Sequence, residues 1–198
     1  MARFHAIAAT SSAIRLLLEN AAGRSGLANV TVELYQAEDL QKPVDAAKPK
    51  LGIYLYRVLL STARRDRGLR VGPDGLTYPP SIPLDLHYLV TAWSPDPRTA
   101  HQMLGWAIRV IDDTPILPAA LLNTYQAGVT VFAPDETVEL VWAPLTLTDL
   151  YDIWQVSAQN QAPSASYVAR MVKLDSESEI PPGAPVEERR FDYAKGPP

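Results

Sequence analysis

The 198-residue sequence has no cysteine, and this absence excludes disulfide bonds, thiol nucleophiles and cysteine-ligated metal sites. Long apolar runs are missing as well. No run approaches the roughly 20 residues that a membrane-spanning helix needs. Polar residues also interrupt the N-terminal apolar stretch where a signal peptide would have its core. We therefore expect a protein that is made and kept in the cytoplasm unless something else carries it out, with no membrane partner.

An excess of positive charge is also lacking. The formal net charge is -4, so no global basic field attracts nucleic acid, and we expect no nucleic-acid partner. The sequence contains no GxGxxG, no phosphate-binding loop and no GxSxG, so it gives no reason to expect a cofactor. The whole sequence is 47% hydrophobic and 20% charged, which is typical of a soluble domain with a hydrophobic core.

The best-specified stretch is residues 83–113, which predicts a core strand, a short loop and a helix. Asp96 is a good N-cap and Pro97 suits the first helical position. One buried face is predicted from apolar residues at helical spacing, namely Ala100, Met103, Leu104, Ala107, Ile108 and Ile111. Gly105 is expected to let another element approach closely. Trp106 falls on the far side, so it is either covered within the fold, which we favour, or offered to a partner.

Hydrophobic periodicity predicts the other elements. Helices are expected at residues 6–22 and 146–156, and strands at residues 30–35, 51–60, 84–92, 129–132, 137–142 and 167–174, with a small hairpin turning at residues 72–75. The strand at 51–60 is apolar on both faces, which favours a central position. The helix at 146–156 begins with a capping box, and its buried stripe is expected to be Leu147, Leu150, Tyr151 and Trp154.

This order indicates the α+β class, with a mixed, mainly antiparallel β-sheet packed against two or three helices. We expect residues 1–175 to form one domain. Residues 176–198 are rich in acidic residues, Ser, Pro and Gly, have no apolar period, and are expected to form a flexible C-terminal tail.

Two charged segments are candidates for contact with partners. Arg64, Arg65, Arg67 and Arg70 cluster beside the hairpin, and they form either a solvated surface or a contact with an acidic protein surface. In the tail, Arg189, Arg190, Phe191 and Tyr193 belong to a short mixed-charge patch. This patch is either an end without a role or a segment that docks on a neighbour by strand addition.

One trio of residues could support chemistry. Asp85 and His87 lie two apart on a predicted strand, so they share a face, and His101 could lie nearby. This arrangement allows a small metal-dependent or acid–base enzyme, but it lacks a spacing signature such as HExxH, and a structural Asp–His pair is favoured. A third interpretation is an adaptor module of a large complex.

Several segments taken together resemble a known family. In order they are IRLLLEN (14–20), LGIYLYRVLLSTARRD (51–66), the run from Ile82 to Leu117, LTLTDLYDIWQ (145–155) and SYVARMVKLD (166–175). Their order is similar to that in tail-cap or tail-terminator proteins of extracellular contractile injection systems, the phage-tail-like particles of the antifeeding-prophage and virulence-cassette type. The resemblance covers nearly all of residues 6–175.

The resemblance implies a structural protein without catalytic residues, metal or cofactor. It implies the α/β tail-terminator fold and a homohexameric ring that stops growth of the inner tube and holds the last layer of the sheath. The implied partners are other copies of the chain, the inner tube protein and the sheath protein. The implied location is the bacterial cytoplasm during assembly, and then a phage-tail-like particle that can be released. On this reading Trp106, the arginine cluster and the tail patch are hypothetical interface residues.

Overall fold

The computed structural model describes residues 4–24, 29–40, 48–62, 68–155 and 161–181. The helices are α1 (Ala6–Ala22), α2 (Pro97–Asp113), α3 (Ala119–Leu122) and α4 (Leu147–Gln155), with 3-10 turns η1 (Ala37–Leu40) and η2 (Asn123–Tyr125). The strands are β1 (Thr31–Tyr35), β2 (Lys50–Leu60), β3 (Arg70–Val71), β4 (Thr77–Tyr78), β5 (Ile82–Trp93), β6 (Ile116–Pro118), β7 (Thr137–Trp142) and β8 (Ser164–Leu174).

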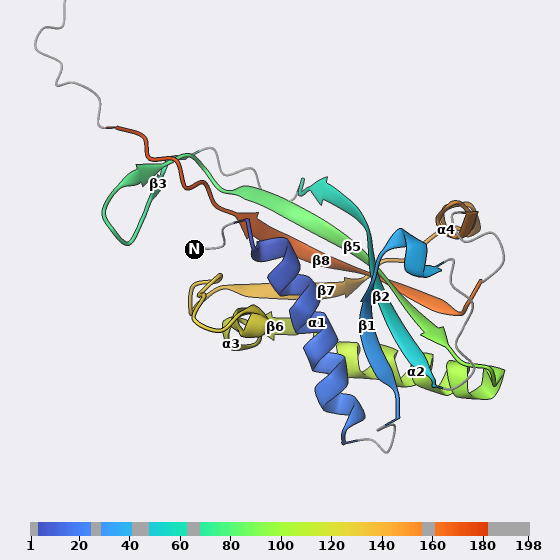
Figure 1. The fold of residues 1–198 in the computed structure, drawn as a ribbon. Helices are drawn as coiled ribbons and strands as arrows, with labels where there is room; N and C mark the ends of the chain where they lie inside the picture. Colours follow the sequence, from blue (N-terminus) through green and yellow to red (C-terminus); the bar gives the residue numbers. More distant parts are fainter. Residues whose placement is uncertain (1–3, 25–28, 41–47, 63–67, 156–160, 182–198) are drawn as a thin grey trace, which may run out of the picture.

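One six-stranded sheet organises the molecule, in the order β1-β2-β5-β8-β7-β6. Only β1 and β2 pair in parallel; the other neighbours in this sheet pair antiparallel. The predicted α+β class with a mixed, mainly antiparallel sheet is therefore confirmed. The hairpin β3–β4 also forms as predicted, and it projects from one end of the sheet (Figure 1).

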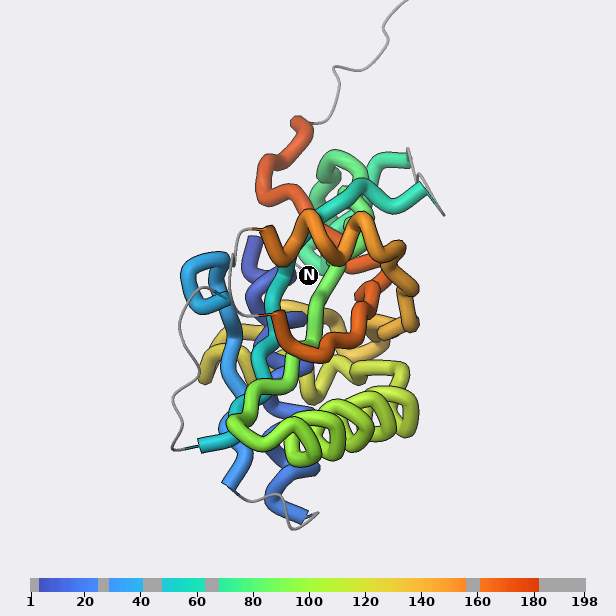
Figure 2. The backbone as a smooth tube through the Cα atoms, turned by 90° about the vertical axis from the view of Figure 1, so that its right-hand side faces the viewer, coloured from blue at the N-terminus to red at the C-terminus, as the bar shows by residue number. Residues whose placement is uncertain are grey.

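The sheet is covered on both faces, by unequal layers (Figure 2). Helices α1, α2 and α3 pack on one face and form the main core with the side chains of Leu86, Tyr88 and Val90. On the opposite face η1 and α4 enclose a smaller cluster of Leu40, Leu89, Trp93 and Trp154. Since successive strand residues point to opposite faces, Tyr88 and Leu89 fall in different clusters.

Helix α2 forms as the sequence predicts. The Asp96 carboxylate accepts hydrogen bonds from the backbone N–H groups of Arg98 at 3.3 Å and Thr99 at 3.0 Å. These bonds satisfy donors that the first helical turn leaves free, so the helix begins at Pro97. The fully buried residues of its inner face are Ala100, Met103, Ala107 and Ile111.

The expectation for Gly105 is wrong. Gly105 lies on the exposed face of α2, and a Cβ placed on it would meet no atom within 4 Å. The close approach of a neighbour occurs instead at Gly52 in β2, where an added Cβ would lie 2.4 Å from Cε2 of Tyr35. Helical periodicity shows which side of a helix is apolar, but it does not show which glycine another side chain covers.

The predicted strand at residues 129–132 is also wrong. Strand β7 is paired by β6 on one side and β8 on the other, so it has no free edge for a hairpin partner. The segment is held by a side chain instead. Asn123 Oδ1 accepts hydrogen bonds from the backbone N–H groups of Val131 and Phe132, and its Nδ2 donates to the Phe132 carbonyl. The apolar pattern of this segment reflects burial of these two side chains and not strand pairing.

Two predictions of burial hold only in part. Strand β2 is buried only in its first half, and β1 pairs with residues 50–54 and stops there. Beyond that point Val58, Leu59 and Leu60 are exposed. In α4, Trp154 is buried, but Leu147 and Tyr151 are 86% and 57% exposed, so the predicted buried stripe is wrong for these two residues. The helix turns its Trp154 side towards the sheet and leaves the opposite side open.

Candidate functional site: surfaces for assembly

Asp85, a member of the possible catalytic trio, is hydrogen-bonded to the backbone of a neighbouring strand. The carboxylate of Asp85 accepts a hydrogen bond of 3.1 Å from the backbone N–H of Met171. Met171 lies at a bulge in β8, where the register with β5 shifts, and its φ of 58° is unusual for a residue with a side chain. Asp85 therefore satisfies a backbone donor at the bulge.

His87 lies on the same strand and borders a hollow of about 390 Å³ between the sheet and α4. Its ring lies edge-on to Tyr56, with centroids 5.8 Å apart. Burial and the nearby Arg57 guanidinium lower the pKa of His87, while the Asp85 carboxylate acts in the opposite direction. The neutral imidazole is thus favoured, and its neighbours are those of a packed side chain.

The structure does not bring His101 to the other two residues. His101 is exposed on α2, which covers the main-core face of the sheet, whereas His87 borders the α4 side. No group of three or more His, Asp or Glu side chains in the described ranges is placed to hold a metal ion. The described part of the chain also contains no helix that is both long and apolar enough to cross a bilayer.

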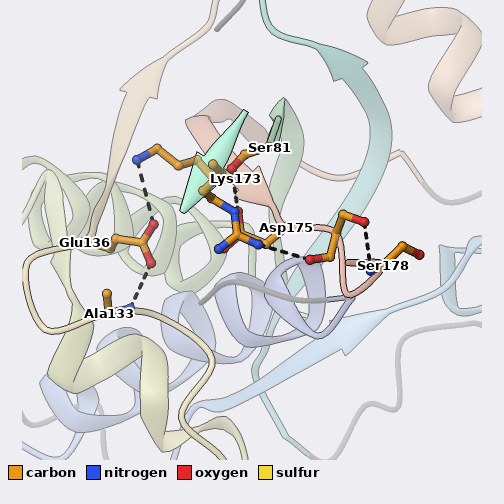
Figure 3. Close-up of polar contacts among 8 residues, drawn as sticks. Ser81, Ala133, Glu136, Lys173, Asp175 and Ser178 are labelled. Carbon is orange, nitrogen blue, oxygen red and sulfur yellow. Dashed lines mark hydrogen bonds and ion pairs between the residues drawn. The ribbon is translucent and has the colours of Figure 1, made fainter. Parts of the chain in front are cut away.

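The projecting hairpin is fastened to the chain that follows β8. Arg70 lies over the ring of Tyr78 at 4.8 Å and donates a hydrogen bond of 3.0 Å to the Ser176 carbonyl. Its Nε also lies 3.8 Å from the Asp175 carboxylate, which accepts a hydrogen bond from Ser81 (Figure 3). Arg70, the one member of the predicted arginine cluster within the described ranges, is therefore engaged by its own chain.

Further along, the Ile180 N–H donates to the Thr77 carbonyl at 2.7 Å. Residues 175–181 consequently run outward beside the hairpin (Figure 1). At the base of this region Lys173 pairs with Glu136, which also accepts a hydrogen bond from the Ala133 N–H (Figure 3). The predicted domain boundary at residue 175 stays a prediction.

Exposed apolar side chains concentrate at this end of the molecule. Thirteen large hydrophobic residues of the described ranges are exposed, and seven of them lie at what we name the distal end. The distal end comprises Val58, Leu59, Leu60, Leu69, Val71, Leu76 and Ile82. Such a concentration of apolar surface is typical of a contact with another protein.

Of the other predicted interface residues, Trp106 is the one within the described ranges. Trp106 is half-buried and packs against the main core, which is the cover within the fold that we favoured. Arg64, Arg65 and Arg67 lie outside the described residues, as do Arg189, Arg190, Phe191 and Tyr193. Their role at an interface stays a prediction.

Residues 58–60 were not predicted to form a surface, because the apolar run of β2 indicated a central strand along its whole length. A signal was available in the predicted lengths. The strand expected at residues 30–35 is shorter than the one at 51–60. If the two strands pair, part of the longer strand must therefore lack a partner on that side.

Two solved structures share this fold. One is described as the PVC sheath/tube terminator of an extracellular contractile injection system in the extended state; it has a TM-score of 0.58 and 18% identity, and the match covers 96% of this chain and 64% of that chain. The other is the tube-terminating cap of the anti-feeding prophage, with a TM-score of 0.50 and 19% identity over 76% of this chain and 52% of that chain. This chain thus spans less than two thirds of either. No curated protein sequence matches it.

The architecture is therefore that of tail terminators of contractile injection systems. The model of the Pvc16 N-terminal domain family matches residues 9–188, and the chain belongs to this family. The resemblance seen in the sequence is confirmed.

Proposed function

We propose that this protein is a structural cap of a contractile injection system. Six copies form a ring on the upper end of the inner tube; the ring stops tube growth and anchors the last layer of the sheath. The observation that carries this proposal is the family match over residues 9–188. The fold shared with a sheath/tube terminator and a tube-terminating cap supports it.

The distribution of exposed apolar residues fits a ring. In a cyclic assembly each copy uses two different surfaces, one for each neighbour. The distal end is one apolar surface. A second is the outer side of α4, with Leu147 and Tyr151, which lies on a different element of the chain. The asymmetry therefore matches the head-to-tail contact that a ring requires.

The proposed contacts with neighbouring copies, the inner tube protein and the sheath protein include the residues singled out in the sequence. They are Arg64, Arg65, Arg67, Arg189, Arg190, Phe191 and Tyr193, whereas Arg70 and Trp106 are engaged within the fold. Assembly takes place in the bacterial cytoplasm, and the cap leaves the cell as part of the particle.

Electron microscopy of injection particles, purified from cells with and without this gene, tests the proposal. Particles from the intact strain should carry a six-fold ring at the end opposite the baseplate. Particles from the deletion strain should have irregular lengths and frayed or missing ends. Uniform, stable particles made without the gene would refute the cap.

A matched pair of variants refines the test. Leu147→Ser removes an exposed apolar side chain from the proposed ring surface, while Ile116→Ser removes one from β6, outside both proposed surfaces. Complementation of the deletion should fail or weaken with the first variant and succeed with the second. Equal complementation by both would remove the outer side of α4 from the ring contact.

A further inference from the structure

The second half of β2 is an open sheet edge. Strand β1 pairs with residues 50–54 of β2, and no described strand pairs with the outer side of residues 55–60. The inner side of this stretch is fully engaged, since residues 57–60 pair with β5 at positions 84–87. An open edge with exposed apolar residues invites pairing with another chain.

The backbone groups that point outward can be named. The Ser61 N–H donates to the Pro83 carbonyl at 2.9 Å, which shows that Ser61 directs its backbone groups inward, towards β5; Pro83 has no N–H to donate in return. Hydrogen-bonded and non-hydrogen-bonded pairs alternate along an antiparallel ladder. Leu60, opposite Leu84, and Val58, opposite Leu86, therefore direct their N–H and C=O groups to the open side.

The side chains at this edge are apolar on both faces. Val58 and Leu60 are 43% and 56% exposed, and they lie on the face of their cross-strand partners Leu86 and Leu84, the main-core face. Leu59 is on the other face. An added strand would cover all three while it supplies partners to the outward backbone groups.

A segment of the chain suits this edge. Residues 186–193, VEERRFDY, contain no glycine or proline, and they place Arg189, Phe191 and Tyr193 at alternate positions. In an extended strand these three side chains share one face. The described chain reaches Pro181 beside the hairpin, at the same end of the molecule as the open edge.

We propose that residues 186–193 of one copy add as a strand to the outer edge of β2, at residues 58–60, of a second copy. Arg189, Phe191 and Tyr193 then lie on the side of Val58 and Leu60, where most of the exposed apolar area is found. The inference rests on the proposed ring, because it identifies one contact between its members.

The path of the chain indicates a second copy as the acceptor. The Ile180–Thr77 hydrogen bond leads the chain outward along the hairpin, away from the body of its own sheet (Figure 1). Val186 lies five positions after Pro181, and an extended chain over five positions reaches about 17 Å. The open edge of the neighbour must therefore lie within this reach of Pro181.

The lack of native cysteine makes a disulfide scan direct. One tagged chain carries Leu60→Cys, and a second, differently tagged chain carries a single cysteine at each position from 187 to 193 in turn. Both are assembled together into particles and oxidised. Efficient disulfide formation needs Cα atoms about 4.4–6.8 Å apart. We expect disulfide-linked dimers of the two tags at alternate positions, and the opposite alternation with Leu59→Cys.

Each outcome is decisive. Particles that carry the protein at one end but give no dimers of the two tags, or dimers without alternation, would overturn the strand addition and leave the cap proposal standing. Alternating dimers in purified protein, together with particles that do not change when the gene is lost, would support the strand addition and overturn the cap.

A backbone variant gives a second readout. Leu60→Pro removes only an N–H that points outward, so the pairing of β2 with β5 keeps its hydrogen bonds. Leu60→Thr is the matched control, since it removes the same apolar side chain and keeps the N–H. In this experiment Val58→Cys replaces Leu60→Cys as the cysteine on the acceptor chain. The proline variant should lose dimer formation, and its circular dichroism spectrum should match that of the threonine variant. Equal dimer formation by the two would count against main-chain pairing.

Discussion

The carboxylate of Asp85 in β5 holds the backbone N–H of Met171 in β8 at 3.1 Å, across the bulge that bends the sheet. The unusual backbone of Met171 and the position of the Asp85 carboxylate therefore have a common explanation. Met171 adopts a φ of 58° that a side chain disfavours, and Asp85 supplies the hydrogen bond that the interrupted ladder does not.

Replacement of Asp85 should therefore affect stability. Asp85→Ala leaves a part-buried N–H without its acceptor, and we expect a loss of about 1–3 kcal/mol in the free energy of unfolding. Asp85→Asn keeps an acceptor oxygen and should lose less. Urea unfolding followed by circular dichroism measures both. An alanine variant as stable as the parent would show that the bulge does not depend on this bond.

Two glycines should respond in opposite directions to alanine. At Gly105 a Cβ meets open space within a helix, so Gly105→Ala should raise the free energy of unfolding by up to about 1 kcal/mol. At Gly52 a Cβ would collide with the Tyr35 ring, so Gly52→Ala should lower it by about 1–3 kcal/mol. Thermal unfolding of the two variants makes the comparison, and a shift of the same sign in both would contradict it.

The Tyr35 ring provides a separate check on Gly52. Burial, followed by the charges of Glu33 and Asp39, raises the pKa of Tyr35 to about 12. Displacement of the ring by Gly52→Ala should expose it and bring this pKa towards the usual value of about 10. Spectrophotometric titration, with Tyr35→Phe to assign the signal, would detect the change; an unaltered pKa would mean that the ring keeps its place.

Substitutions on the two sides of α4 should affect different properties, stability on the inner side and assembly on the outer side. Trp154 packs against Trp93, with ring centroids 5.8 Å apart, and Trp154→Ala should cost about 3–5 kcal/mol of unfolding free energy. Leu147→Ser changes a side chain that is 86% exposed and should leave unfolding nearly unchanged. Urea midpoints test both expectations. A large stability loss in the Leu147 variant would mean that its effect on particles says nothing about an interface.

Stability should fall mildly as the solution becomes acidic, through His87. The lowered pKa of His87 in the folded state means that the unfolded chain takes up its proton first. Stability is fully present above the unfolded pKa of about 6.5 and declines as pH falls below it, towards the folded value. His87→Gln should make the urea midpoint of unfolding less dependent on pH between pH 8 and pH 5.5. An identical pH dependence in the variant would place its origin elsewhere.

Local signals predicted much of this fold correctly. The cap at Asp96 and the apolar face of Ala100, Met103 and Ala107 depend on neighbours three or four residues away, and so they can be read from the chain. The same holds for the hairpin, whose turn contains Gly75 with a φ of 78°. The resemblance to the family likewise follows from the order of such segments.

The errors have a common cause, which is that the partner of a residue lies far away in the sequence. Residues 129–132 were predicted as a strand because nothing local shows that Asn123 satisfies their backbone groups. Leu147 and Leu60 were predicted as buried because apolar character does not reveal whether a neighbour covers it.

The sequence by itself determined most of the elements, the fold class and the absence of cysteine chemistry, because these depend on composition and short-range periodicity, and its resemblance to known tail terminators indicated the family. Only the tertiary structure decided which apolar residues are left uncovered. Strand β1 stops opposite Tyr54 while β2 continues to Leu60, and α4 turns Trp154 inward and Leu147 outward. These surfaces are decided by strand pairing and packing between distant segments, and they are the surfaces on which we expect assembly to depend.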